Sequence, residues 1–248
     1  SEISNIKDCD IIWLTFDTPV NDQDEVDLQP IWDFLNNAVG FFKEDLLLII
    51  SSQMPIGTTE AINTFIKKPR PHLHFDIAYV PENLQLGKAV ESFTKPGRIV
   101  IGSSSEAATK KIKNIFSSLA SSFLTMNTAS GEMSKHALNA FLATSLSFTY
   151  DIADLCQLYG ADLSAVTKAL RSDDRIGPGA YLDVSLGFSG GTLARDLKIL
   201  LDKAHSANIT LPVISAVLEK NNSRRALVLS YLERRLGTLQ GKKITVFG

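Results

Sequence analysis

The chain has 248 residues, of which 44% are hydrophobic, and this is enough for one large or two ordinary domains with buried cores. Its 25 Lys and Arg residues nearly balance its 27 Asp and Glu residues, and a net charge of -2 excludes a broad attraction to nucleic acid or to an anionic membrane. No apolar run reaches the roughly 18 residues that a membrane span needs, and the start SEISNIKDCD lacks a signal pattern, so we expect a cytoplasmic protein. Cys9 and Cys156 lie far apart in apolar surroundings and are predicted to be reduced core residues.

The first half of the chain alternates between strand-like and helix-like patterns. Short, nearly continuous apolar runs predict buried strands at residues 10–16, 46–50, 75–80 and 98–102. Helical patterns follow three of these runs, at residues 28–42, 58–66 and 106–120. We expect Thr58 or Thr59 to cap the second of these helices and Ser104 or Ser105 to cap the third. Strands that alternate with helices favour an α/β fold with a mostly parallel sheet.

The second half is predicted to be helical. Residues 132–159 contain no Gly or Pro, and apolar or small residues recur there every three or four positions, which predicts one long helix that stops at Gly160. A short helix capped by Asp162 is expected next, and two more helices are expected at 193–207 and 212–236. Residues 241–248 have the pattern of a new buried strand that meets its first turn glycine.

These patterns divide the chain into three predicted parts, at residues 1–128, 129–238 and 239–248. A parallel dinucleotide-binding domain normally opens with a strand and a Gly-x-Gly-x-x-Gly turn, and no such triplet of glycines occurs in this sequence. The sequence also starts without Met. We therefore expect a fragment whose first domain lacks the half that grips the first cofactor phosphates.

The segment 175–200 has the features of a binding site. The glycine-bearing turn 187–191 precedes an apolar helix pattern, so backbone N–H groups at the start of that helix are available to an anion or an oxyanion. Thr192 and Asp196 are four residues apart, which places a hydroxyl and a carboxylate on one helical face. Asp196 is either a general base or a residue that stabilises the first turn of the helix.

Three more polar residues are candidates for chemistry. Lys135 and Asn139 are four residues apart on the long helix, so an ammonium and an amide can hold one substrate hydroxyl, although such pairs also occur on solvated helix faces. Glu82 follows Pro81 at the end of a predicted strand, where parallel sheets place groups that face a ligand. The alternative for Glu82 is a helix cap or a solvent contact.

The remaining charged features are weak. His72 and His74 lack a third ligand, and we predict no metal. The basic pairs at 110–111, 224–225 and 234–235 are predicted to be solvated helix faces, and they form no nucleic-acid site.

Seven groups of residues together resemble the ordered motifs of one enzyme family. They are Asp17-Thr18-Pro19, residues 51–58 (SSQMPIGT), Val80-Pro81-Glu82-Asn83-Leu84, residues 98–102 (RIVIG), Lys135 with Asn139, Asp174-Arg175-Ile176-Gly177, and Gly187-Phe188-Ser189-Gly190-Gly191. In order and spacing they are similar to the UDP-glucose/GDP-mannose (nucleotide-sugar 6-) dehydrogenases, and the resemblance runs from the start to Gly248.

The resemblance implies an α/β fold with a partial Rossmann-like parallel sheet, followed by an all-helical central dimerisation domain. Residues 1–128 would be the second half of the NAD-binding domain, 129–238 the central domain, and 239–248 the first strand of a truncated UDP-sugar-binding domain. The implied partners are a UDP-sugar substrate and a second copy of the chain, which forms a homodimer through the central helix. The implied reaction is oxidation of the sugar C6 hydroxyl towards the uronate with NAD. Because the phosphate-gripping turn is missing, we expect weak or no NAD binding by this piece.

The resemblance also assigns roles to residues. It makes Glu82, Lys135, Asn139, Thr192 and Asp196 the catalytic set. It assigns NAD to Thr18, Pro19, Ser52, Gln53 and Arg195. It assigns the substrate to Asn83, Leu84, Arg175, Tyr181, Leu182, Phe188 and Ser189, with Arg175 reaching into the sugar site of the partner subunit.

One departure from the family concerns the second oxidation, which proceeds through a thioester on a cysteine. Thr192 stands at the position of that cysteine, and Leu86 stands where the family usually has a second Glu. An alcohol is a much weaker nucleophile than a thiolate, so we expect the covalent step to fail and Thr192 to be the N-cap of its own helix. Two alternatives stay open: a catalytically degenerate sugar-nucleotide-binding scaffold, and a two-electron dehydrogenase that stops at the aldehyde.

Overall fold

The computed structural model describes residues 3–20, 26–84, 87–188, 192–245 and 247. The chain divides into two compact units, Ser1–Leu138 and Asn139–Gly248. The division falls within one long helix, and each unit has its own core.

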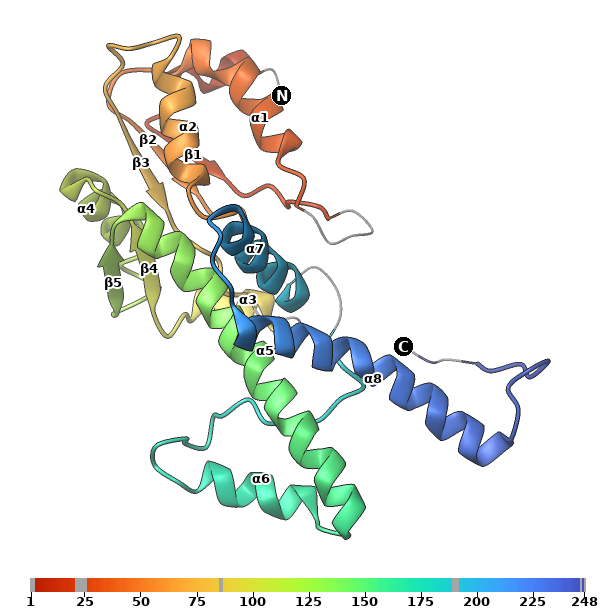
Figure 1. The fold of residues 1–248 in the computed structure, drawn as a ribbon. Coiled ribbons are helices and arrows are strands. Elements are labelled where there is room, and N and C mark those ends of the chain that lie inside the picture. Colours follow the sequence, from red (N-terminus) through yellow and green to blue (C-terminus); the bar gives the residue numbers. More distant parts are fainter. Residues whose placement is uncertain (1–2, 21–25, 85–86, 189–191, 246, 248) are drawn as a thin grey trace. The chain divides into compact units, whose positions relative to one another are not determined.

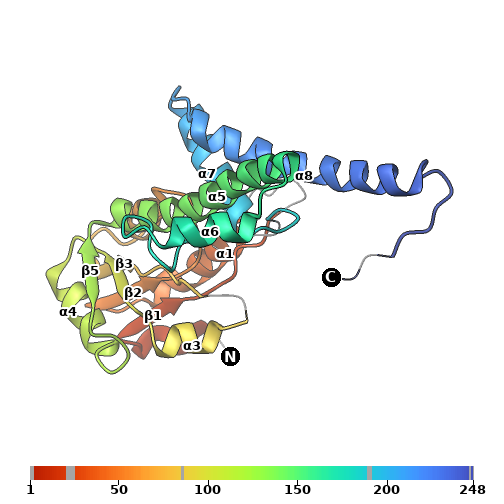
Figure 2. The ribbon, with the colours of Figure 1, turned by 90° about the horizontal axis from the view of Figure 1, so that it is seen from below.

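The first unit is built on a five-stranded sheet (Figures 1 and 2). Its strands lie side by side in chain order: β1 (Ile11–Leu14), β2 (Leu46–Ile50), β3 (Phe75–Tyr79), β4 (Ile99–Gly102) and β5 (Phe123–Met126). Strands β1, β2 and β3 are parallel to one another and β4 is parallel to β5, whereas β3 and β4 are antiparallel. The predicted α/β fold with a mostly parallel sheet is confirmed. Strand β5 escaped prediction because its residues are only half buried or exposed, so it lacks a continuous apolar run.

Helices cover both faces of this sheet (Figure 1). They are η1 (Ile3–Asp8), α1 (Gln29–Ala38), η2 (Val39–Phe41), α2 (Thr58–Lys67), α3 (Ala89–Thr94) and α4 (Glu106–Ile115). Alternate residues of β2 point to opposite faces. Leu46, Leu48 and Ile50 pack in the cluster that contains α1 and α2, while Leu47 and Ile49 pack in the cluster that contains α4. The run LLLII is apolar throughout because both of its faces are buried.

Of the two N-caps predicted for helices of this unit, one is confirmed. Ser105 caps α4, since its hydroxyl accepts a hydrogen bond from the backbone N–H of Ala108, as predicted. The prediction of Thr58 or Thr59 as the cap of α2 is wrong. Gly57 occupies that position with φ of 91°, where a left-handed backbone favours glycine, and Glu132 binds the first N–H groups of the helix.

The long predicted helix is α5 (Thr128–Tyr159), and it begins one turn earlier than expected. Gly131 does not precede the helix but lies within its first turns. A Cβ atom at Gly131 would lie 2.9 Å from the Cα atom of Gly102 in β4, so the glycine allows the helix to approach the strand closely. Gly160 follows the helix with φ of 69°, as expected for a glycine at a helix end.

The second unit contains the rest of α5 and three further helices. These are α6 (Leu163–Arg171), α7 (Leu193–Ser206) and α8 (Pro212–Leu236). Asp162 caps α6 as predicted, because its carboxylate accepts a hydrogen bond from the N–H of Ser164. Small residues on α5, Ala140 and Ala143, pack in one apolar cluster with Leu197 of α7 and Val217 of α8.

The end of the chain differs from its prediction. The described residues in the predicted strand, 241–245 and 247, are not in a strand. Cys9 and Cys156 are free thiols, half-buried and buried respectively. No helix in the described part of the chain combines the length and apolar character needed to cross a membrane.

Candidate active site

Lys135 and Glu82 meet in the first unit. Lys135 lies on α5 and is only 6% exposed, so the alternative of a solvated helix face is wrong for this residue. Its Nζ donates to the backbone carbonyl of Glu82 at 2.5 Å and lies 3.3 Å from the Glu82 carboxylate. Glu82 comes just after the carboxyl end of β3, and its other carboxylate oxygen accepts from the N–H of Leu84 at 2.7 Å. The result is a buried ammonium beside a carboxylate that is 39% exposed.

Asn139 and Asp196 meet in the second unit. Asn139 is 5% exposed on α5, one helical turn after Lys135, and Asp196 is fully buried in the first turn of α7. The Asn139 amide donates a hydrogen bond to the Asp196 carboxylate. A carboxylate in the first helical turn is also favoured by the helix dipole. Both readings of Asp196, a base and a stabiliser of its helix, therefore stay compatible with its position.

Thr192 precedes α7 but does not cap it through its side chain. It occupies the N-cap position and is exposed, and its hydroxyl makes no capping hydrogen bond. The expectation of a side-chain cap is wrong, because its backbone has φ of -118° and ψ of -80° rather than the extended conformation usual for a capping residue.

The residues assigned to NAD in the first unit surround the turn after β2. Thr18 is buried and donates its hydroxyl to the carbonyl of Gln53 at 2.7 Å, and the next residue, Pro19, is exposed. His136 of α5 contacts the carbonyl of Met54 at 2.9 Å. Ser52 is buried, and its hydroxyl has no hydrogen-bond partner within the described chain. A polar atom of this kind at the carboxyl end of a parallel strand fits a polar group of a ligand such as NAD.

Arg195, also assigned to NAD, is buried on α7 in the second unit. Four residues named in the sequence analysis lie outside the described residues: Leu86, the candidate substrate residue Ser189, and the turn glycines Gly190 and Gly191. Asn83 and Leu84 are exposed beside Glu82.

Tyr181 and Leu182 lie in a segment that α6 holds in place. Arg171, the last residue of α6, donates to the carbonyl of Ala180 at 3.2 Å and to the carboxylate of Asp183 at 2.8 Å. These contacts lie on either side of the two candidate substrate residues. Tyr181 is exposed and Leu182 is buried, so of the two only Tyr181 presents a large surface.

Arg175 stands out from the surface of the second unit, with its side chain 89% exposed. Asp173 binds it through two parallel contacts, of 2.9 Å to Nε and 2.7 Å to Nη2. The hydrogen bonds from Arg175 hold the pKa of the Asp173 carboxyl below its ordinary value. An exposed, oriented guanidinium is suited to contact another molecule.

Four polar residues that the sequence analysis did not select have structural roles near these candidates. Glu132 and His136 hold the segment that runs from Met54 into α2, and Asn221 and Arg224 bind the segment before α7. The prediction that Arg224 is part of a solvated face is wrong, because it is buried against Tyr150. A signal for Glu132 was present: polar residues at 132, 135, 136 and 139 recur at helical spacing, which indicates one polar helix face.

Within the described ranges, no three His, Cys, Asp or Glu side chains gather as metal ligands would.

The fold and these contacts define a class of protein. It has a mostly parallel α/β domain, with a buried hydroxyl in the turn after β2 that has no partner among the described residues, and a helical domain with a buried Asn–Asp pair. Residues 1–120 match the NAD binding domain of the UDP-glucose/GDP-mannose dehydrogenase family, and residues 129–223 match the central domain of the same family. The chain therefore belongs to the UDP-glucose/GDP-mannose dehydrogenase family, whose cofactor is NAD.

Its relatives agree with this assignment. UDP-glucose 6-dehydrogenase TuaD from Bacillus subtilis is 33% identical over 250 residues, which cover 99% of this chain and 53% of TuaD. A UDP-glucose 6-dehydrogenase from Rickettsia conorii is 30% identical, covering 99% of this chain and 56% of the relative. The structure of a UDP-glucose dehydrogenase from Pyrobaculum islandicum superposes with a TM-score of 0.89 at 28% identity, covering 96% of this chain and 56% of that one. The chain spans about half the length of the relatives it matches.

Proposed function

We propose that the protein takes part in NAD-dependent oxidation of the C6 hydroxyl of a nucleotide sugar, such as UDP-glucose, towards the uronate. The observation that carries this proposal is the buried pair of polar residues on α5, Lys135 and Asn139, each bonded to a carboxylate-bearing residue. Burial of a charged or amide side chain on a helix is costly, so two such residues held by specific partners favour a chemical role over a solvated helix face. NAD, when bound, supplies the hydride acceptor.

Each residue then has a distinct task. The ammonium of Lys135 stabilises alkoxide character on the sugar oxygen, because a fixed positive charge in a buried place is more effective than one in water. Glu82 keeps that ammonium in place through its carbonyl and its carboxylate. In the second unit, Asn139 fixes the Asp196 carboxylate, which is suited to accept a proton as a general base.

Thr192 favours a second candidate outcome, a two-electron oxidation that stops at the aldehyde. Its hydroxyl is exposed and makes no capping bond, but an alcohol without an adjacent base is a poor nucleophile for the covalent second step. In the scaffold alternative the protein still binds a nucleotide sugar but catalyses neither oxidation.

The proposal includes a homodimer formed through α5. Phe141, Phe148 and Leu155 are exposed at intervals of seven residues, and Leu158 and Tyr159 extend the same apolar surface to the helix end. An apolar seam with this spacing is typical of a helix that packs against another helix. The domain boundaries at 128/129 and 238/239 are part of the same proposal.

The test is to incubate the whole protein that contains this chain with UDP-glucose and NAD and to measure both NADH and the mass of the sugar product. Two NADH per sugar and a uronate support the full reaction, whereas one NADH and an aldehyde support the two-electron reaction. Lys135→Met should abolish either signal, and Lys113→Met, a change on α4, is the matched control. Calorimetric binding of UDP-glucose without NADH would support the scaffold, and neither binding nor NADH would contradict the proposal.

A further inference from the structure

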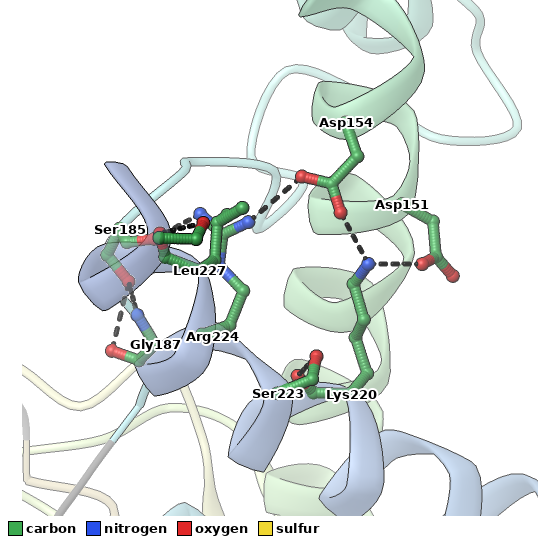
Figure 3. Close-up of polar contacts among 9 residues, drawn as sticks. Asp151, Asp154, Ser185, Gly187, Lys220, Ser223, Arg224 and Leu227 are labelled. Carbon is green, nitrogen blue, oxygen red and sulfur yellow. Dashed lines mark hydrogen bonds and ion pairs between the residues drawn. The ribbon is translucent and has the colours of Figure 1, made fainter. Parts of the chain in front are cut away.

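The segment that leads to Thr192 is bonded to one face of α8 (Figure 3). Arg224 donates from Nη2 to the carbonyl of Ser185 at 3.2 Å. One turn earlier on α8, Asn221 binds the backbone of Phe188 twice: its Oδ1 accepts from the N–H at 2.8 Å and its Nδ2 donates to the carbonyl at 2.8 Å. Two side chains of one helix thus hold both ends of the segment 185–188.

Arg224 is itself fixed by α5. Its guanidinium is buried, lies 4.7 Å from the centre of the Tyr150 ring, and donates to Asp154 at 3.1 Å. The Tyr150 hydroxyl also lies 2.8 Å from the hydroxyl of Ser185. The planar guanidinium is therefore oriented by a carboxylate and a ring, which directs its Nη2 to the carbonyl of Ser185.

A second cation completes the charge balance. Lys220 lies on α8 one turn before Arg224, and its Nζ is 2.7 Å from both Asp151 and Asp154 (Figure 3). Two cations of α8 thus face two carboxylates of α5. Because Asp154 binds both cations, its position, and with it that of Arg224, is determined from two sides.

Gly187 gives independent evidence that the segment lies close to α8. Its φ of 134° is in the region that favours glycine, and a Cβ atom there would lie 3.0 Å from Oδ1 of Asn221 and 3.6 Å from Cβ of Arg224. A side chain at position 187 would require the Asn221 amide to move by a few tenths of an ångström.

We propose that Arg224 and Asn221 are positioning residues, which hold the segment 185–188 in the conformation that binds the hexose of a nucleotide sugar. Phe188 meets a sugar only if the proposed function holds, so this role rests on that function. The hexose is the relevant part of the ligand because the segment leads to Thr192, which matches the family position that attacks the sugar C6. A segment ordered before binding costs less entropy when the ligand arrives.

The test compares pairs of identical substitutions on neighbouring residues. Asn221→Ala and Arg224→Lys remove the contacts, while Asn222→Ala and Arg225→Lys change exposed residues beside them. Arg224→Lys keeps a cation next to Asp154 but lacks the fork that also reaches Ser185. Two quantities are measured on the full chain: amide exchange at Phe188, and the affinities for UDP-glucose and for UDP by calorimetry.

We expect Asn221→Ala to speed exchange at Phe188 by about tenfold, because the N–H of Phe188 loses its hydrogen bond to Oδ1 of Asn221. Both test variants should bind UDP-glucose about tenfold more weakly, while the affinity for UDP and the exchange of α8 amides stay as in the unaltered chain. A merely structural role would change those last two readouts as well.

The outcomes separate this role from the function on which it rests. If the unaltered chain binds UDP-glucose and the test variants bind it equally well, the positioning role is contradicted and the function stands. Equal loss of affinity for UDP-glucose and UDP, or faster exchange throughout α8, also contradicts it. If the unaltered chain binds no UDP-glucose, the proposed function fails and the positioning role fails with it.

Discussion

The ammonium of Lys135 is almost completely buried, yet it is not isolated. A carbonyl and a carboxylate of Glu82 both lie within reach of it. Leaving such a charge without partners inside a protein is strongly destabilising. The contacts of Lys135 on α5 with Glu82 after β3 remove that cost. Thr192 presents the opposite case, since its hydroxyl is exposed and makes no capping bond to α7.

Replacing the alcohol at position 192 by a thiol should restore the second oxidation. Thr192→Cys is expected to raise uronate formation from UDP-glucose and NAD by about tenfold or more, because a thiolate at a helix start is a far better nucleophile than an alcohol. The product is identified by mass. Thr192→Ser keeps an alcohol and serves as the control; an equal uronate yield from both variants would refute the role assigned to this position.

Lys220 predicts a dependence of stability on pH. Burial alone lowers the pKa of its ammonium, but the hydrogen bonds and charges of Asp151 and Asp154 outweigh burial and hold the pKa above its ordinary value of 10.5. The unfolded chain therefore loses this proton first, so the contribution is complete below pH 10.5 and disappears as the pH rises through the higher folded pKa.

Urea denaturation at a series of pH values gives the free energy of unfolding of the unaltered chain and of Lys220→Met. The quantity of interest is the first value minus the second. This difference should be constant from neutral pH to just below 10.5 and should fall above it. Lys110→Met, at an exposed position of α4, is measured alongside. A difference that grows above pH 10.5 would show that the sign is wrong.

Among the elements, α5 does more in the first unit than contribute a candidate catalytic lysine. Its Glu132 carboxylate accepts hydrogen bonds from the N–H groups of Gly57 and Thr59 and from the Thr59 hydroxyl, at 2.6 to 2.8 Å. An anion at the start of α2 is also stabilised by the dipole of that helix. One helix thus caps another and fixes the turn that precedes it, which contains residues assigned to NAD.

Glu132→Gln should lower the free energy of unfolding by about 1–3 kcal/mol, because it replaces a charged acceptor of three hydrogen bonds by a neutral amide of the same shape. The control is Glu60→Gln, the same change at an exposed position in the first turn of α2, which should alter stability by less than about 0.5 kcal/mol. Chemical denaturation measures both. Similar values for the two variants would exclude the capping role of Glu132.

For the chain as a whole, the exposed apolar seam on α5 predicts assembly. Phe141, Phe148 and Leu155 would have to stay in water in a monomer, and apolar surfaces of this kind mark protein interfaces. In a twofold dimer the same surface of each copy forms the interface, so the seam of one copy would pack against the seam of the other.

Phe148→Asp should therefore shift the chain from dimer to monomer, because a carboxylate in each half of the interface adds repulsion and loses apolar contact. Sedimentation velocity reports the change directly. Val90→Asp, an exposed apolar residue on α3, should leave the sedimentation coefficient unchanged. A monomeric unaltered chain would disprove the dimer.

The regular elements of this protein were largely predictable because their patterns are local. The run LLLII predicts β2 without error, and the interval between Leu211 and Gly237 predicts α8, since a strand buried on both faces and a helix bounded by Pro and Gly need no distant information. The motifs likewise identified the family, because residue order and spacing are properties of the chain itself.

The tertiary structure decided which polar side chains meet. Glu132 capping α2 from 73 residues away, Asn221 bonding Phe188, and Arg224 buried beside Tyr150 depend on contacts between distant elements. Sequence spacing carries information about local geometry only. It therefore predicts that Thr59 caps the helix in which it lies and that Arg224 faces solvent. A hydrogen bond depends on distance in space, and only folding sets that distance.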